Sequence, residues 1–159
     1  MQTLETILAQ HPFFKGLDAR YMSLITGCAS NVRYKADEYF FHEGEAAERF
    51  YMLREGRVAL ETHGPQHREI VIETIEAGEA LGWSWLFPPY RWHFSARALQ
   101  DVRAIALDGV CLRTKGAQDH DLGYELAMRV ARILMERLQS TRLQLLDLYE
   151  AEGRRVIYE

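Results

Sequence analysis

The chain has 159 residues, of which 48% are hydrophobic, and its 23 acidic and 19 basic side chains give a net charge of −4. This composition fits a single folded domain and excludes a disordered chain, and no apolar run reaches the ~18 residues that span a bilayer. The first residues, MQTLE, lack the basic start and apolar stretch of a secretory signal. We therefore expect a cytoplasmic protein with no membrane partner. The acidic balance argues against nucleic acid as the main partner of this chain.

The first ~30 residues show helical spacing, and the following residues, up to about 106, show strand patterns. Leu4, Ile7 and Leu8 recur at helical intervals, and Asp18 is the predicted N-cap of a second helix over residues 19–29. Five short apolar or alternating runs then predict strands at residues 39–41, 50–53, 58–60, 70–72 and 102–107. Glycines between these runs predict turns, at Gly44, Gly56, Gly64, Gly78 and Gly82. Many short strands favour a closed or sandwiched β architecture, and periodicity alone leaves a generic β-sandwich open.

A brief helix is expected after Asp108, and a long one over residues 121–149, where strong helix formers run without a proline. Leu122, Leu126, Val130 and Ile133 form one apolar stripe along it. A second stripe alternates spacings of three and four and forms a heptad seam: Tyr124, Ala127, Ala131, Leu134, Leu138, Thr141, Leu145 and Leu148. A helix with two apolar faces needs two partners, so we expect a homodimer through paired helices, with burial inside a monomer as the alternative.

The sequence gives little support for a metal site or for a catalytic site. His63 and His67 are the only histidines at a ligand-like spacing, and we expect no metal site. The cysteines, Cys28 and Cys111, are too few for a disulfide framework or a four-thiolate site. We find no nucleophile–base arrangement and no glycine-rich phosphate loop, so an enzyme is not expected.

One segment of the sequence carries a pattern that is specific enough to indicate a protein family. Residues 40–56, FFHEGEAAERFYMLREG, place two apolar residues before a turn glycine, then a small residue, four apolar residues and a second glycine. This pattern resembles the first signature of the cyclic-nucleotide-binding domain of the Crp–Fnr superfamily, and every fixed position is matched. The resemblance continues through GRVAL at 56–60 and IEAGEALG at 75–82, and it covers residues 11–150.

The resemblance implies a mainly β fold with flanking helices. It implies a double-stranded β-helix, a jelly-roll-like β-roll with the ligand in its cavity, followed by a long C-terminal dimerisation helix. On this basis we expect the β-roll and N-terminal helices in residues 1–120, and the long helix with a short tail in residues 121–159. Relatives that read DNA carry a winged helix-turn-helix after the long helix. Here about ten residues follow it, so we expect this chain to contact no nucleic acid.

The second signature, the phosphate cassette, departs from the family at LGWSWLFPPYRWHFSARA, residues 81–98. In nucleotide-binding members a glutamate after the glycine accepts from the ribose hydroxyl, and an arginine followed by Ser or Thr holds the phosphate. Trp83 stands at the glutamate position, and an indole only donates hydrogen bonds. Losing one charged hydrogen bond, worth ~1.5–3 kcal/mol, costs one to two decades of affinity. A cyclic nucleotide is thus possible, although not favoured in the usual mode, and no cofactor is certain.

The arginines and the helix contacts also differ. Arg91 is the counterpart of the phosphate arginine, although Trp92 follows it, and Arg97 corresponds to the second arginine. An alternative is that Arg91 only stacks on a neighbouring aromatic ring. Arg137 and Leu138 stand where cyclic-AMP-responsive relatives carry a Thr-Ser pair for adenine. The predicted ligand-binding residues are Gly82, Trp83, Ser84, Trp85, Leu86, Arg91, Trp92, His93, Arg97 and Arg137.

The cassette region concentrates aromatic residues, including every tryptophan in the chain. They either fill the ancestral pocket, line a reshaped pocket for a flat or apolar ligand with Arg91 or His93 as anchor, or form a patch for a protein partner. We expect a stand-alone sensory domain that binds a small-molecule effector and relays its presence through a homodimer. The alternatives are a protein-interaction scaffold with a filled pocket, and a fragment of a cyclic-AMP-responsive transcription regulator without its DNA-binding domain.

Overall fold

The computed structural model describes residues 2–158, and the side-chain surroundings of residues 2–66 and 68–153. The chain begins with two short helices, α1 (Leu4–Gln10) and α2 (Ala19–Thr26). Asp18 caps α2, because its carboxylate accepts from the amide of Arg20 at 2.8 Å, as predicted. The predicted helix over residues 19–29 is too long, however. The helix ends at Thr26 with Gly27 as its C-cap, and Ala29 already pairs with Leu107 in a sheet.

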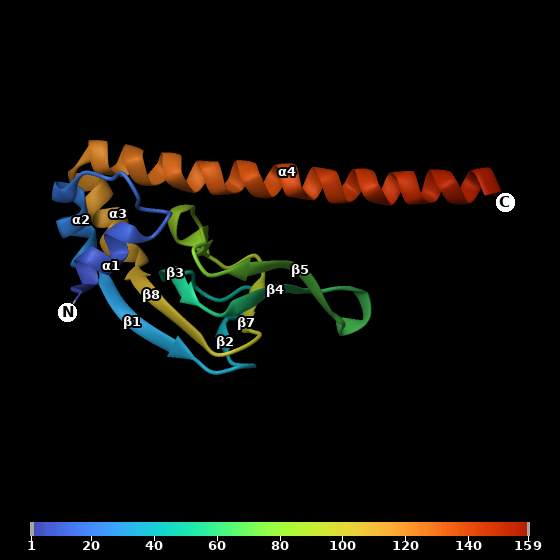
Figure 1. Ribbon diagram of the computed structural model, residues 1–159, viewed down its shortest axis with the longest axis horizontal. Helices are drawn as coiled ribbons and strands as arrows, with labels where there is room; N and C mark the ends of the chain where they lie inside the picture. Colours follow the sequence, from blue (N-terminus) through green and yellow to red (C-terminus); the bar gives the residue numbers. More distant parts are fainter. Residues whose placement is uncertain (1, 159) are drawn as a thin grey trace. The chain divides into compact units, whose positions relative to one another are not determined.

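Eight strands form two four-stranded antiparallel sheets (Figure 1). The first sheet has the order β1-β8-β3-β6, with bounds Ala29–Tyr34, Val102–Asp108, Arg49–Glu55 and Ala80–Leu81. The second has the order β2-β7-β4-β5, with bounds Tyr39–Phe41, Ser95–Ala98, Arg57–His63 and Glu69–Glu76. The strands expected from the sequence are all present, and β1, β6 and β7 are additional. The mainly β fold with flanking helices is confirmed.

The roll interior is a continuous apolar cluster contributed by both sheets. The first sheet supplies Tyr51 and Leu53 with three residues of β8, and the second supplies residues of β4, β5 and β7. Alternation of side chains along each strand sends the intervening residues to the outer faces. The buried members of the cluster are Phe40, Phe41, Ala47, Tyr51, Leu53, Val58, Leu60, Ile75, Leu81, Trp92, Phe94, Ala96, Ala98, Val102, Ala104 and Ala106.

The turns follow the glycine pattern. Gly56 joins β3 to β4 with φ of 96°, and a Cβ there would lie 2.5 Å from the carbonyl oxygen of Asp101. A side chain is therefore excluded both by the backbone conformation and by space. Two 3₁₀ turns interrupt the β-region, η1 (Pro65–His67) and η2 (Ser84–Leu86).

Helices return after β8. Asp108 caps α3 (Gly109–Gln118) by accepting from the amide of Cys111 at 2.7 Å. α1, α2 and α3 lie together at one end of the β-roll (Figure 1). The chain divides into two compact units, Met1–Gly123 and Tyr124–Glu159.

The last helix, α4 (His120–Tyr158), crosses the boundary between these units and extends beyond the predicted end at residue 149. Its continuation follows from the helix formers and the absence of proline in the final residues. Within the described residues, no helix combines the length and the apolarity that crossing a membrane requires.

Candidate functional site

The phosphate-cassette region connects β6 to β7 through η2. β6 ends at Leu81, and the next residue, Gly82, has a φ of 86° in the left-handed region, so a glycine is needed at this turn. Ser84 and Trp85 begin η2 and are buried, and the loop after η2 carries Arg91 and Trp92 toward β7.

Trp92 fills the space beside Gly82 in the roll interior. Its ring stacks on Phe41 with centroids 3.7 Å apart and planes 8° apart. It is 4% exposed and belongs to the interior cluster. A Cβ on Gly82 would lie 2.6 Å from the indole, so the two residues are in close contact. This indole therefore covers the residue at which the cassette begins.

A second aromatic group surrounds Trp83, which is half-buried at the edge of the same cluster. The ring of Trp83 stacks on His93 at 5.6 Å and meets Phe87 and Phe94 edge-on. The hydroxyl of Ser84 is hydrogen-bonded to Nδ1 of His93 at 3.2 Å, which fixes the imidazole against Trp83. Phe87 is 42% exposed, so this group reaches the surface.

Trp85 and Leu86 have a different environment. Trp85 is fully buried but lies outside the interior cluster, and its ring packs on Phe50 at 5.2 Å. Arg113 of α3 donates to the Trp85 carbonyl. This hydrogen bond thus connects η2 to α3. The next residue, Leu86, is half-buried. The Trp85 indole N–H has no hydrogen-bond partner among the described residues.

The two cassette arginines are engaged with protein groups. Arg91 is exposed, and its Nη1 donates to the carbonyl of Gly44 at 3.2 Å. Arg97 is on the outer face of the second sheet, where its Nε donates to Oε1 of Glu61 at 2.7 Å and its Nη1 to Asp37 at 3.0 Å. The hydrogen bond to Glu61 raises the pKa of Arg97 above its ordinary value. The ligand role assigned to either arginine stays a prediction.

The roll interior offers few polar groups. Tyr51 is 4% exposed there, and burial raises the pKa of its phenol well above the usual range. The hydroxyl is therefore neutral at physiological pH. A ligand that entered this interior would meet aromatic rings and a neutral hydroxyl from Tyr51.

The remaining predicted residues lie on α4. Arg137 is half-buried in the second unit, and its predicted contact with a ligand stays a prediction. The stripe residues Leu122, Leu126 and Val130 are buried. Most of the heptad seam is exposed in the single chain: Tyr124, Ala127, Ala131, Leu138, Thr141, Leu145 and Leu148, with Leu134 half-buried.

One covalent feature of the fold was not predicted from the sequence. Cys28 and Cys111 form a disulfide, with Cα atoms 5.7 Å apart across a sequence separation of 83 residues. The bridge ties the segment between α2 and β1 to the first turn of α3. Two cysteines are too few for a framework of several bridges, but they suffice for this single link. Among the described residues, no three His, Cys, Asp or Glu side chains are grouped so that they could hold a metal ion.

Comparison with known proteins identifies the family to which this fold belongs. Residues 31–119 match the family model of the cyclic nucleotide-binding domain. The chain belongs to this family, and the resemblance to the Crp–Fnr type is confirmed.

Individual proteins with similar sequences or folds are consistent with this family assignment. A CRP-like cAMP-activated global transcriptional regulator from Mycobacterium tuberculosis is 27% identical over 145 residues, which are 91% of this chain and 63% of the relative. The N-terminal domain of a transcriptional regulator from Streptomyces coelicolor is 27% identical with a TM-score of 0.66, covering 85% of this chain and 94% of that one. Catabolite activator protein from Thermus thermophilus shares the fold, with a TM-score of 0.68 at 23% identity over 84% of this chain and 61% of its own.

Proposed function

We propose that this chain is a sensory domain that binds a small effector within the β-roll and relays its presence through paired C-terminal helices. The effector is not a cyclic nucleotide held in the family's usual mode. One observation supports the exclusion of the usual nucleotide-binding mode: the indole of Trp92 lies against Gly82 and stacks flat on Phe41. In the family's cassette, the glycine at this point precedes the sugar contact.

The chemistry of the neighbouring residues supports this proposal. Trp83 replaces the acceptor that a ribose hydroxyl needs, because an indole N–H only donates. The guanidiniums of Arg91 and Arg97 donate to Gly44 and to Glu61. The rings around Trp83 favour a flat apolar ligand, for which the exposed His93 offers a polar anchor.

Calorimetry with cyclic AMP and cyclic GMP, together with native mass spectrometry of the purified protein, tests the ligand class. We expect no tight nucleotide binding, and a co-purifying aromatic molecule would support the proposal. Trp83→Glu should increase nucleotide affinity, whereas Trp83→Gln, which adds no charge, should increase it less. Low-micromolar binding of cyclic AMP to the unmodified chain would contradict our view of the cassette.

A second candidate function is a protein-interaction scaffold with a filled interior. The observation that favours it is the burial of Trp92, Phe41 and Phe94 in one continuous cluster. This scaffold would retain no small molecule and would show no thermal shift in a metabolite screen. A tight co-purifying ligand would exclude it.

The relay requires a homodimer, and the exposed heptad seam of α4 supports one. The chain spans 63% of the length of the curated Mycobacterium tuberculosis relatives. A role as the sensory part of a cyclic-AMP-responsive regulator therefore remains an alternative proposal, which DNA retardation by the full gene product would support. We also propose a cytoplasmic, non-catalytic protein, in keeping with a family of ligand-binding regulatory domains.

A further inference from the structure

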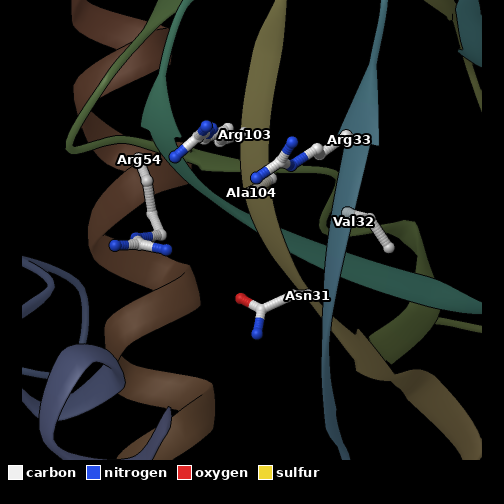
Figure 2. A pocket seen from close by; sticks show the side chains of 6 residues that line it. All are labelled: Asn31, Val32, Arg33, Arg54, Arg103 and Ala104. Atoms are coloured by element: carbon white, nitrogen blue, oxygen red, sulfur yellow. The ribbon is translucent and has the colours of Figure 1, made fainter. Parts of the chain in front are cut away.

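A cluster of arginines lies on the outer face of the first sheet, outside the β-roll interior. Arg33 of β1, Arg54 of β3 and Arg103 of β8 line a hollow of 220 Å³ together with Asn31, Val32 and Ala104. Figure 2 shows the three arginine side chains and the amide of Asn31 around one space, while the side chain of Val32 lies on the other side of β1. Residues from positions 31 to 104 are brought together only by the order of strands in this sheet.

The sheet register places these positive charges against one another. Arg33 and Arg103 are direct cross-strand partners. Like charges at directly opposed positions destabilise a sheet. Arg54 is the extra residue of a bulge, because Leu53 pairs with Ala104 while Glu55 already pairs with Arg103. A bulge redirects a side chain, and here it accompanies a third guanidinium at the hollow.

Little negative charge offsets this cluster. Arg103 has one acidic neighbour, Glu55, at 3.7 Å, and both side chains are at least half exposed. Among the described side chains, neither Arg33 nor Arg54 has a carboxylate within salt-bridge distance. The second sheet behaves differently, since Arg57 faces Glu76 across the strands at 3.2 Å. A chain with a net charge of −4 therefore keeps a positive cluster that is offset by a carboxylate only at Arg103 among its described side chains.

We propose that this hollow binds the phosphate group of a small soluble anion. Guanidinium groups present paired N–H donors that match phosphate oxygens, and several of them around one space provide charge as well as geometry. The amide of Asn31 adds a further donor for an oxygen. The volume of 220 Å³ is below the ~300–1,000 Å³ of pockets that enclose drug-sized ligands, so it suits a phosphate or diphosphate group.

This site is separate from the effector site proposed for the roll interior. Val32, Leu53 and Ala104 pack toward the interior cluster, while the alternating positions that carry the arginines face outward. An anion could therefore bind here whether or not the interior holds a ligand. The charge cluster would give the domain a second input that responds to a phosphorylated molecule.

Titration calorimetry with pyrophosphate at low ionic strength tests the proposal. We expect saturable one-site binding that weakens by about tenfold or more in each of Arg33→Gln and Arg54→Gln. The matched control is Arg57→Gln, which removes the same charge from the other sheet and should change the affinity by less than about twofold. Trp92→Ala, which alters only the interior, should leave pyrophosphate binding intact.

Several results would overturn the proposal. These are the absence of saturable pyrophosphate binding, an equal loss in Arg57→Gln, and loss of binding in a folded Trp92→Ala protein. Binding to phosphatidylserine vesicles or to double-stranded DNA without binding to pyrophosphate would also overturn it, because the face would then serve a macromolecular surface. Far-ultraviolet circular dichroism of each variant confirms that the chain is folded in these comparisons.

Discussion

Nε2 of His11, at the end of α1, lies 3.1 Å from the carbonyl oxygen of Leu53 in β3. Nδ1 of the same ring accepts from the amide of Phe13 at 3.2 Å, so the neutral ring with its proton on Nε2 satisfies both bonds. Burial lowers the pKa of His11 below its ordinary value of 6.5, and the backbone hydrogen bonds oppose this only in part. The folded state therefore favours the neutral imidazole.

This arrangement makes stability depend on pH. Because the pKa is lower in the folded chain, the contribution of His11 is complete above pH 6.5 and is lost as the pH falls through the folded-state pKa. We expect the urea midpoint to decrease below pH 6.5 and the decrease to be smaller in His11→Gln. His120→Gln, at an exposed position, is the control, and an unchanged pH profile in His11→Gln would contradict the prediction.

Gly82→Ala should be far more destabilising than Gly44→Ala. Both glycines have φ near 87°, at 86° and 88°, but an added Cβ at Gly82 meets Trp92 at 2.6 Å whereas the one at Gly44 meets nothing within 4 Å. We expect Gly44→Ala to cost about 1 kcal/mol, and Gly82→Ala a further 1–3 kcal/mol or so from overpacking. Urea unfolding measures both. Equal losses would mean that the buried indole moves aside without cost.

Reduction of the Cys28–Cys111 disulfide should lower the stability of the chain. A bridge that closes a separation of 83 residues restricts the unfolded ensemble, and its loss costs about 2–5 kcal/mol. Thermal unfolding with and without dithiothreitol measures this loss. The double variant Cys28→Ser with Cys111→Ser should unfold at the temperature of the reduced protein and ignore the reductant. A reductant effect of equal size in that variant would exclude the bridge as its cause.

We expect the ion pair between Arg97 and Glu61 to stabilise the folded chain. Glu61 is 1% exposed, so Arg97→Met would leave a buried carboxylate without its guanidinium, at a cost of about 3 kcal/mol. Adding Glu61→Gln should recover part of the loss. Arg57→Met breaks the exposed pair with Glu76 and should cost less than ~1 kcal/mol. If Arg97→Met were as mild as this control, Arg97 would be available for a ligand instead.

Leu134→Glu combined with Leu145→Glu should convert the protein to monomers, because charges at seam positions prevent two helices from packing. The control is Gln139→Glu with Leu146→Glu, which adds the same charge outside the seam, at exposed positions of α4. Light scattering measures the oligomeric state of both variants. A dimer that survives in the seam variant, or a wild-type monomer, would exclude pairing through this stripe.

The strands and caps with strong local signals were predicted from the sequence. The run Tyr39–Phe41 has the bounds of β2, and Asp18 caps α2 as predicted, because a carboxylate at that position needs only local geometry. The helix after Asp108 was also predicted, although the cap that Asp108 forms was not. β7 was missed because Ser95–Ala98 contains small residues and an arginine, which have little strand preference of their own. Its conformation comes from pairing with β2 and β4 on both sides.

In the candidate sites too, features within one continuous segment could be predicted, whereas contacts between residues distant in the sequence could not. The aromatic cassette is a contiguous segment, so its composition could be recognised in the sequence, although the stacking of Trp92 on Phe41 depends on the fold. The outward direction of Arg97 depends on the register with β4. Cys28 and Cys111, like the three arginines around the outer hollow, are distant in sequence and meet only through strand order.

The disulfide also changes the covalent topology of the molecule. Residues 28 and 111 close a ring that contains all eight strands, while α1, α2 and α4 lie on the two open arms of the chain. A protease that cuts once anywhere between the two cysteines opens the ring but releases no fragment. Nicked protein should therefore migrate as one piece on a non-reducing gel and separate into two after reduction, which makes the β-roll a self-retaining unit.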